Sequence, residues 1–148
     1  MKWDKYFADM CKLVASKSKD RSTKVGCIIV GLDNEIRATG YNGFIRGAND
    51  NREDWHQRPL KYSVTAHAEA NAVCASARIG VPLKGCTAYV SLPPCANCAV
   101  LLAQAGIKEV KVLRYPDNWN TLDTWKEQFK IAEEIFKEGK IHFSFIKE

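Results

Sequence analysis

Two short motifs carry the side chains that could bind a metal and move protons. They are His67-Ala-Glu69 and Pro94-Cys95-Ala-Asn-Cys98, and each opens a predicted helix. Cysteines three positions apart share one face of a helix, so both can bind one ion. The N–H groups and dipole at a helix start favour thiolates. With His67 as a third ligand, the set suits zinc and leaves a fourth position for water.

The remaining polar group of these motifs is Glu69. It follows His67 by two positions, and side chains so spaced on a regular helix point in different directions. We therefore expect His67 on the metal and Glu69 beside a water molecule whose pKa zinc lowers. Glu69 would take a proton from this water, pass it to a ring nitrogen and help ammonia to leave. The two motifs together form the H-x-E…P-C-x-x-C signature of zinc-dependent base deaminases.

Length and charge limit what else the chain can be. Its 148 residues predict a single domain over 1–148, and the net charge of +5 is too diffuse for a nucleic-acid groove. No secretory signal and no apolar run of membrane-spanning length is present, so we expect a cytoplasmic protein without a membrane partner. In a reducing compartment a Cys-x-x-Cys pair indicates metal or catalysis. We expect the other four cysteines in the core: Cys11, Cys27, Cys74 and Cys86.

The spacing of hydrophobic residues predicts the helices and strands that would position these motifs. The last three predicted strands are joined by helices and should be parallel, whereas the first two form an antiparallel hairpin. We therefore predict an α/β fold, a three-layer α/β/α domain with a five-stranded mixed sheet and a parallel last strand. Together with the two motifs, this arrangement resembles the cytidine-deaminase-like fold. Thr65 is the expected N-cap of the second helix, and Trp3 and Tyr6 are expected in the core. The predicted helices span 3–15, 66–79, 93–105 and 122–138, and the strands 25–30, 36–40, 86–91, 110–113 and 141–146.

The sequence resembles the deoxycytidylate (dCMP) deaminase family along nearly its whole length. A helix between the last two strands sets it apart from free-nucleoside cytidine deaminases. The long segment between Asn42 and His67 resembles an effector-binding insertion that transfer-RNA adenosine deaminases lack. The matching stretches are Trp3-Asp-x-Tyr6-Phe7, Arg21-Ser-Thr-Lys-Val-Gly26, Gly40-Tyr-Asn-Gly43, Lys61-Tyr62, His67-Ala-Glu-Ala-Asn-Ala72 and Gln104-Ala-Gly-Ile-Lys-Glu-Val110.

This resemblance implies conversion of dCMP to dUMP and ammonia, a step of nucleotide biosynthesis that feeds dTTP synthesis. It also implies a homohexamer that dCTP activates and dTTP inhibits, with Mg²⁺ on the triphosphate. The implied catalytic set is Glu69 with zinc on His67, Cys95 and Cys98. Asn42 would hydrogen-bond the sugar, although an Asn-Gly pair is also a common turn. Phosphate candidates are Lys24, Arg114 and Tyr115, effector candidates are Tyr41, Gly43 and Arg46, and residues 91–93 would line the base pocket.

Other readings of the same motifs remain. A deaminase of this fold could act on a free nucleoside, guanine, a pterin-like ring or adenosine in RNA. The chain could also be a non-catalytic, zinc-stabilised binding domain, but retention of Glu69 favours an enzyme. A structural zinc site is the third alternative, and such sites usually take four protein ligands.

Overall fold

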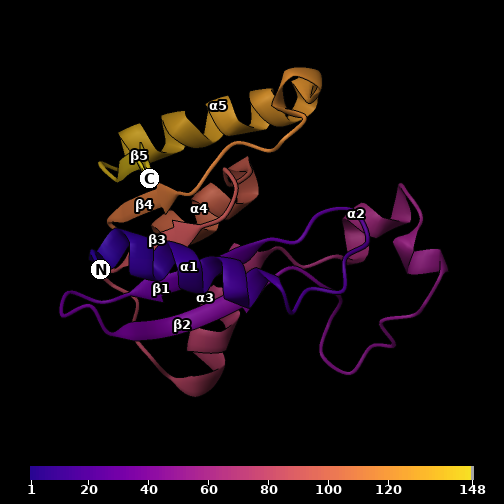
Figure 1. Ribbon diagram of the computed structural model, residues 1–148, viewed down its shortest axis with the longest axis horizontal. Helices are drawn as coiled ribbons and strands as arrows, with labels where there is room; N and C mark the ends of the chain where they lie inside the picture. The colour runs from indigo at the N-terminus through magenta and orange to yellow at the C-terminus, as the bar shows by residue number, and fades with distance from the viewer. Residues whose placement is uncertain (148) are drawn as a thin grey trace.

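The computed structural model describes residues 1–147 as one mixed five-stranded sheet with helices on both faces (Figure 1). The strand order is β2-β1-β3-β4-β5, in which β2, β1 and β3 are antiparallel neighbours and β3, β4 and β5 run parallel. The predicted sheet and its parallel last strand are therefore confirmed. The strands are β1 (Gly26–Val30), β2 (Ile36–Tyr41), β3 (Thr87–Val90), β4 (Glu109–Val112) and β5 (His142–Phe145).

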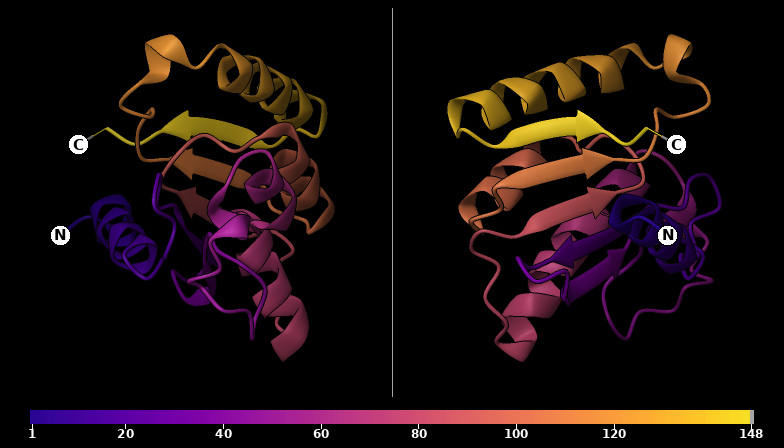
Figure 2. Two further views of the ribbon diagram at one scale, coloured as in Figure 1. Left: turned by 90° about the vertical axis from the view of Figure 1, so that its right-hand side faces the viewer. Right: turned by 60° about the vertical axis from the view of Figure 1, so that its left-hand side comes forward.

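The helices divide between the two faces of the sheet, as Figure 2 shows. One face carries α1, and the other carries α3, α4 and α5. The long segment between β2 and α3 contains two short helices, η1 and α2, which the sequence analysis did not predict. The helical bounds are α1 (Trp3–Ala15), η1 (Asp54–His56), α2 (Leu60–Val64), α3 (Ala68–Ile79), α4 (Ala96–Gln104), η2 (Trp119–Thr121) and α5 (Asp123–Glu138).

Alternating side chains of β1 build both halves of the core. Ile28 and Val30 pack with Phe7 of α1, whereas Cys27 and Ile29 pack on the side of α3 and α4. Because successive side chains of a strand point to opposite faces, a strand covered on both sides is apolar throughout, and all five residues of β1 are buried. This central strand fixes the sheet against which the helix starts are placed.

Several local expectations were wrong. Trp3 and Tyr6 are 54% and 40% exposed, because α1 buries only the narrow stripe that faces the sheet. Cys74 is exposed, while the other three cysteines expected in the core are buried. Thr65 is not the N-cap of α3. Ala66 is still extended, in an isolated bridge to Gly43, so the helix begins two residues later and His67 is its N-cap. Within residues 1–147 no helix is long and apolar enough to cross a membrane.

Candidate zinc centre and substrate pocket

The starts of α3 and α4 bring the two motifs together. His67 is the N-cap of α3 and Cys95 is the N-cap of α4. The Nδ1 atom of His67 lies 3.5 Å from Sγ of Cys95 and 3.3 Å from Sγ of Cys98. The three ligand atoms lie within 4.8 Å of one another, and the group contains no fourth His, Cys, Asp or Glu among residues 1–147.

A glycine lets the sheet hold the histidine side of this centre. At Gly40 in β2, an added Cβ would collide with the backbone of Ala68 and Ala72 in α3. Because glycine has no Cβ, the first turns of α3 rest directly on the strand. This contact holds the start of α3, where His67 and Glu69 lie, directly against β2.

The three candidate ligand side chains shift one another's pKa. The pKa of Cys95 is lowered, first by a hydrogen bond from Cys98 and then by His67, against the effect of burial. The pKa of Cys98 is raised, first by its hydrogen bond with Cys95 and then by burial. The pKa of His67 is raised by its hydrogen bond with Cys95. One nitrogen and two sulfur donors this close together fit a divalent ion with affinity for nitrogen and sulfur, such as zinc.

Glu69 lies at the floor of the site and outside the ligand group. Its side chain is buried, with 4% relative exposure, yet it lines the main pocket. Burial raises the pKa of Glu69 above its ordinary value. A carboxyl group with a raised pKa can hold a proton and release it near neutral pH, which is what a general acid and base requires.

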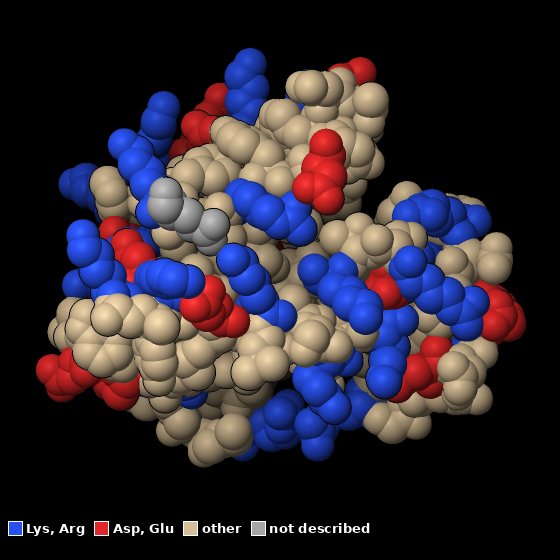
Figure 3. All heavy atoms as spheres, viewed as in Figure 1, with Lys and Arg blue, Asp and Glu red and all other residues tan. Residues whose placement is uncertain are grey.

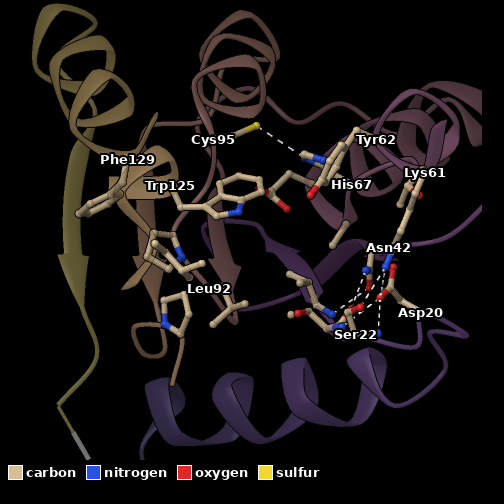
Figure 4. A pocket seen from close by; sticks show the side chains of 18 of the residues that line it. Asp20, Ser22, Asn42, Lys61, Tyr62, His67, Leu92, Cys95, Trp125 and Phe129 are labelled. Carbon is tan, nitrogen blue, oxygen red and sulfur yellow. Dashed lines mark hydrogen bonds and ion pairs between the residues drawn. The ribbon is translucent and has the colours of Figure 1, made fainter. Parts of the chain in front are cut away.

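The main pocket extends from this centre to a polar end about the Asp20–Lys61 ion pair (Figure 4). Its volume is about 390 Å³. Nζ of Lys61 lies 3.0 Å from Oδ1 of Asp20, and the two side chains are 9% and 7% exposed. Burial alone would raise the pKa of Asp20, but the N–H groups of Thr23 and Ser22 and the ammonium of Lys61 hold it below its ordinary value. The pair is therefore ionised and locks α2 to the loop after α1.

Arg58 is the second cation at this end of the pocket. Its guanidinium donates to the hydroxyl oxygens of Tyr62 at 2.8 Å and Ser22 at 3.3 Å. Within the described chain it has no carboxylate partner, whereas Lys61 is neutralised by Asp20. Arg58 thus carries the uncompensated positive charge of the pocket.

Asn42 stands in the wall between the main pocket and a second cavity. Its Oδ1 accepts from the N–H of Val25 at 2.9 Å, and its Nδ2 donates to the carbonyl of Thr23 at 2.9 Å. An amide retains one further donor and one further lone pair beyond these two bonds. The side chain therefore fixes the backbone of the loop at residues 23 and 25, and it can still form hydrogen bonds with a ligand in either cavity.

The predicted phosphate residues are not brought to the main pocket. Lys24, Arg114 and Tyr115 are exposed and lie outside its lining. Arg114 instead pairs with Asp117, and the Tyr115 ring packs against Trp119 at 4.6 Å. The predicted effector residues do lie together, in the second cavity of about 440 Å³, which is lined by Tyr41, Gly43, Arg46, Lys17 and Lys19 among others.

Sequence reasoning missed Arg58 and Trp125 in the main pocket. Arg58 could be found only from its place in the long polar segment that ends at the histidine motif. Trp125 carried a clearer signal, since it precedes Phe129 by four positions and so shares a helix face with this core residue.

Comparison with protein families identifies a known zinc-binding region. Residues 1–114 match the family described as cytidine and deoxycytidylate deaminase zinc-binding region. The mouse deoxycytidylate deaminase is 38% identical over 99% of this chain and 84% of its own length. A protein of Aliivibrio fischeri described as a deaminase is 35% identical over 98% of this chain and 94% of its own length.

The fold has close counterparts among solved structures. The crystal structure of the dCMP deaminase of cyanophage S-TIM5 superimposes with a TM-score of 0.75 at 23% sequence identity, and covers 99% of this chain and all of the phage chain. The similarity extends through the C-terminal helix and strand, which lie beyond the residues that the family description matches.

Proposed function

The chain belongs to the cytidine and deoxycytidylate deaminase family, and from this premise we propose that it hydrolyses dCMP to dUMP and ammonia. One observation carries the proposal: a single pocket joins the His67–Cys95–Cys98 cluster and buried Glu69 at one end to uncompensated Arg58 at the other. The first end suits deamination of a base, and the second suits an anionic group attached to the same molecule.

The ligand residues fit zinc by donor type and spacing. Bound there, zinc supplies Lewis acidity and a water molecule that is acidic enough to act near neutral pH. Glu69 accepts a proton from the attacking water and delivers it to the ring nitrogen beside the amine-bearing carbon. The water oxygen bonds to that carbon as a hydroxyl group. Glu69 then takes the second proton from this hydroxyl and passes it to the amine, and the carbon–nitrogen bond breaks to release ammonia as the carbonyl of dUMP forms.

At the other end, Arg58 would bind the 5′-phosphate. Its guanidinium, which donates to the hydroxyl oxygens of Ser22 and Tyr62, is the charge that supports this role. Basic side chains gather over the neighbouring segment around α2 and η1, with acidic ones among them, as Figure 3 shows. Such a surface raises the local concentration of phosphorylated ligands. Asn42 has the spare hydrogen-bonding capacity to meet the sugar between the two ends.

We also propose the second cavity as the effector site. Lys17, Lys19 and Arg46 line it, and three cations suit a triphosphate such as dCTP or dTTP, with Mg²⁺ on its phosphates. Asp20 and Asn42 line both cavities, so a ligand in one shares a wall with the other. We further propose that the protein is a homohexamer. Sedimentation with and without dCTP and dTTP measures its oligomeric state and any change that these nucleotides cause.

The test is ammonia release by the zinc-loaded protein from dCMP, deoxycytidine, dCTP and adenosine, each with and without dCTP or dTTP as effector. We expect turnover of dCMP well above that of deoxycytidine, raised by dCTP and lowered by dTTP. Turnover of deoxycytidine or adenosine in preference to dCMP would show that dCMP is not the preferred substrate. No turnover of any of them would favour another base or a binding domain.

A further inference from the structure

The first turn of α4 carries two candidate zinc ligands but no capping oxygen of its own. The first N–H groups of a helix have no partner inside the helix, and a side-chain oxygen of the N-cap residue usually accepts from one of them. The N-cap of α4 is Cys95, whose sulfur belongs to the candidate metal cluster. An oxygen acceptor for the N–H of Ala96, the first residue of the helix, therefore has to come from another element.

Gln128 of α5 supplies this oxygen. Its Oε1 accepts a hydrogen bond of 3.1 Å from the N–H of Ala96, 32 positions away in sequence. The other side of the same peptide group is held as well, because the carbonyl oxygen of Cys95 accepts from the N–H of Ala99 at 2.9 Å. The peptide plane between Cys95 and Ala96 is thus held at both ends. Because this plane is bonded to the α-carbon of Cys95, it limits the directions in which the Cys95 sulfur can point.

Helix α5 is firmly placed to make this hydrogen bond. It lies beside α4 on one face of the sheet (Figure 1). Phe129, the residue after Gln128, is 6% exposed, and its ring lies 5.4 Å from that of Phe143 in β5. Gln128 itself is half-buried and does not line the main pocket. Its hydrogen bond therefore serves the start of α4 and does not face the proposed substrate.

We propose that Gln128 is a positioning residue of the zinc centre, which holds the peptide group after Cys95 so that its sulfur stays directed toward the other two ligands. The inference rests on the zinc of the proposed function but not on its substrate. Groups that orient the ligands of a metal contribute roughly 10- to 100-fold to its affinity. Gln128 lies beyond residue 114, where the match to the zinc-binding family ends, so the family motifs do not contain this support.

The test measures the zinc affinity of the folded protein by competition with a chromophoric chelator. Gln128→Leu removes the acceptor, keeps a residue that favours helix, and should weaken zinc binding by roughly tenfold. Gln128→Glu keeps an acceptor oxygen at the same distance along the side chain and should bind zinc close to wild type. Glu127→Leu, at the exposed neighbouring position of α5, is the matched control and should leave the zinc affinity unchanged.

A residue that only capped the helix would behave differently. Its loss would lower the melting temperatures of the metal-free and zinc-loaded forms equally and leave the zinc affinity unchanged, and this result would overturn the inference. The positioning role predicts the larger decrease for the zinc-loaded form, because a more weakly bound ligand stabilises the fold less. Equal loss of zinc affinity in Gln128→Glu and Gln128→Leu would also overturn it. If Gln128→Leu does not fold, Gln128→Met carries the same expectation.

The outcomes separate this inference from the proposed function. A wild type that releases no ammonia from dCMP, while its zinc affinity depends on Gln128, would reject the proposed reaction and support the positioning role. Turnover of dCMP together with a zinc affinity that Gln128→Leu leaves unchanged would support the reaction and overturn the inference.

Discussion

The two ends of the main pocket are built from different kinds of contact. At the zinc end, His67, Cys95 and Cys98 come from helix starts that rest on the sheet, so short motifs define them. At the polar end, Asp20 and Lys61 are 41 positions apart in sequence, and Arg58 is exposed. The residues proposed for the chemistry therefore follow from local sequence. Those proposed for substrate choice depend on how loops that are distant in sequence meet.

Removal of the metal from the zinc end of the pocket should have the largest effect on the protein. Loss of zinc, by a chelator or by Cys98→Ala, should abolish turnover and lower the melting temperature, because zinc binding contributes to folding. Metal analysis and a thermal scan on the same samples measure both effects. Arg58→Ala is the control and should retain zinc. Stoichiometric zinc in Cys98→Ala would remove this residue from the ligand set.

Glu69→Gln should have the next largest effect. The substitution keeps the shape of the side chain and removes the group that moves protons, so turnover should fall by about 100- to 10,000-fold. Zinc content and dUMP affinity should stay near those of wild type. Steady-state kinetics with metal analysis provide the measurement. Near-full activity in this variant would contradict the proposed role of Glu69.

Asp20→Asn tests whether the polar end of the pocket stabilises the fold. It leaves the buried ammonium of Lys61 without a counter-charge, and loss of one partner of a buried pair costs about 3 kcal/mol of unfolding free energy. The folded pKa of Asp20 is depressed, so its contribution is full above the unfolded value of about 4 and is lost as the pH falls through the folded pKa. Denaturant titrations of wild type and variant should therefore differ at pH 7 and converge in acid. A constant difference would reject this assignment.

Arg58→Ala should have the smallest effect and the most selective one. Loss of one charge-assisted contact should lower kcat/KM for dCMP by about tenfold and leave deoxycytidine unchanged. Arg21→Ala is a matched control, because Arg21 already pairs with Glu53 and lies outside the pocket lining. An equal loss for both substrates would show that Arg58 supports the loop and not the phosphate.

The His67–Cys95–Cys98 cluster and the sheet could be predicted because both follow from short-range patterns. Cys95 and Cys98 share a helix face by spacing alone, and the helix before β5 requires a parallel strand. The basic side chains that line the main pocket could not be predicted in the same way. Lys24 and Arg114 have the right charge, but charge does not reveal which basic side chains a folded loop turns toward the pocket.

Prediction also failed where packing outweighs residue type. Trp3 is aromatic and follows the helical spacing of α1, yet it is exposed, because the sheet covers only one stripe of that helix. Helix α2 spans five residues, too few for periodicity to indicate it. Lys61 lies in this helix and is buried because Asp20 meets it there, a contact that no local pattern contains.

The most direct test of the two-ended pocket is one kinetic comparison. kcat/KM is measured for dCMP and deoxycytidine with wild type, Glu69→Gln and Arg58→Ala, all zinc-loaded. The account predicts that Glu69→Gln lowers both substrates by a similar large factor, while Arg58→Ala lowers dCMP alone and narrows its advantage over deoxycytidine. An unchanged ratio of the two substrates in Arg58→Ala would contradict the separation of chemistry from phosphate recognition.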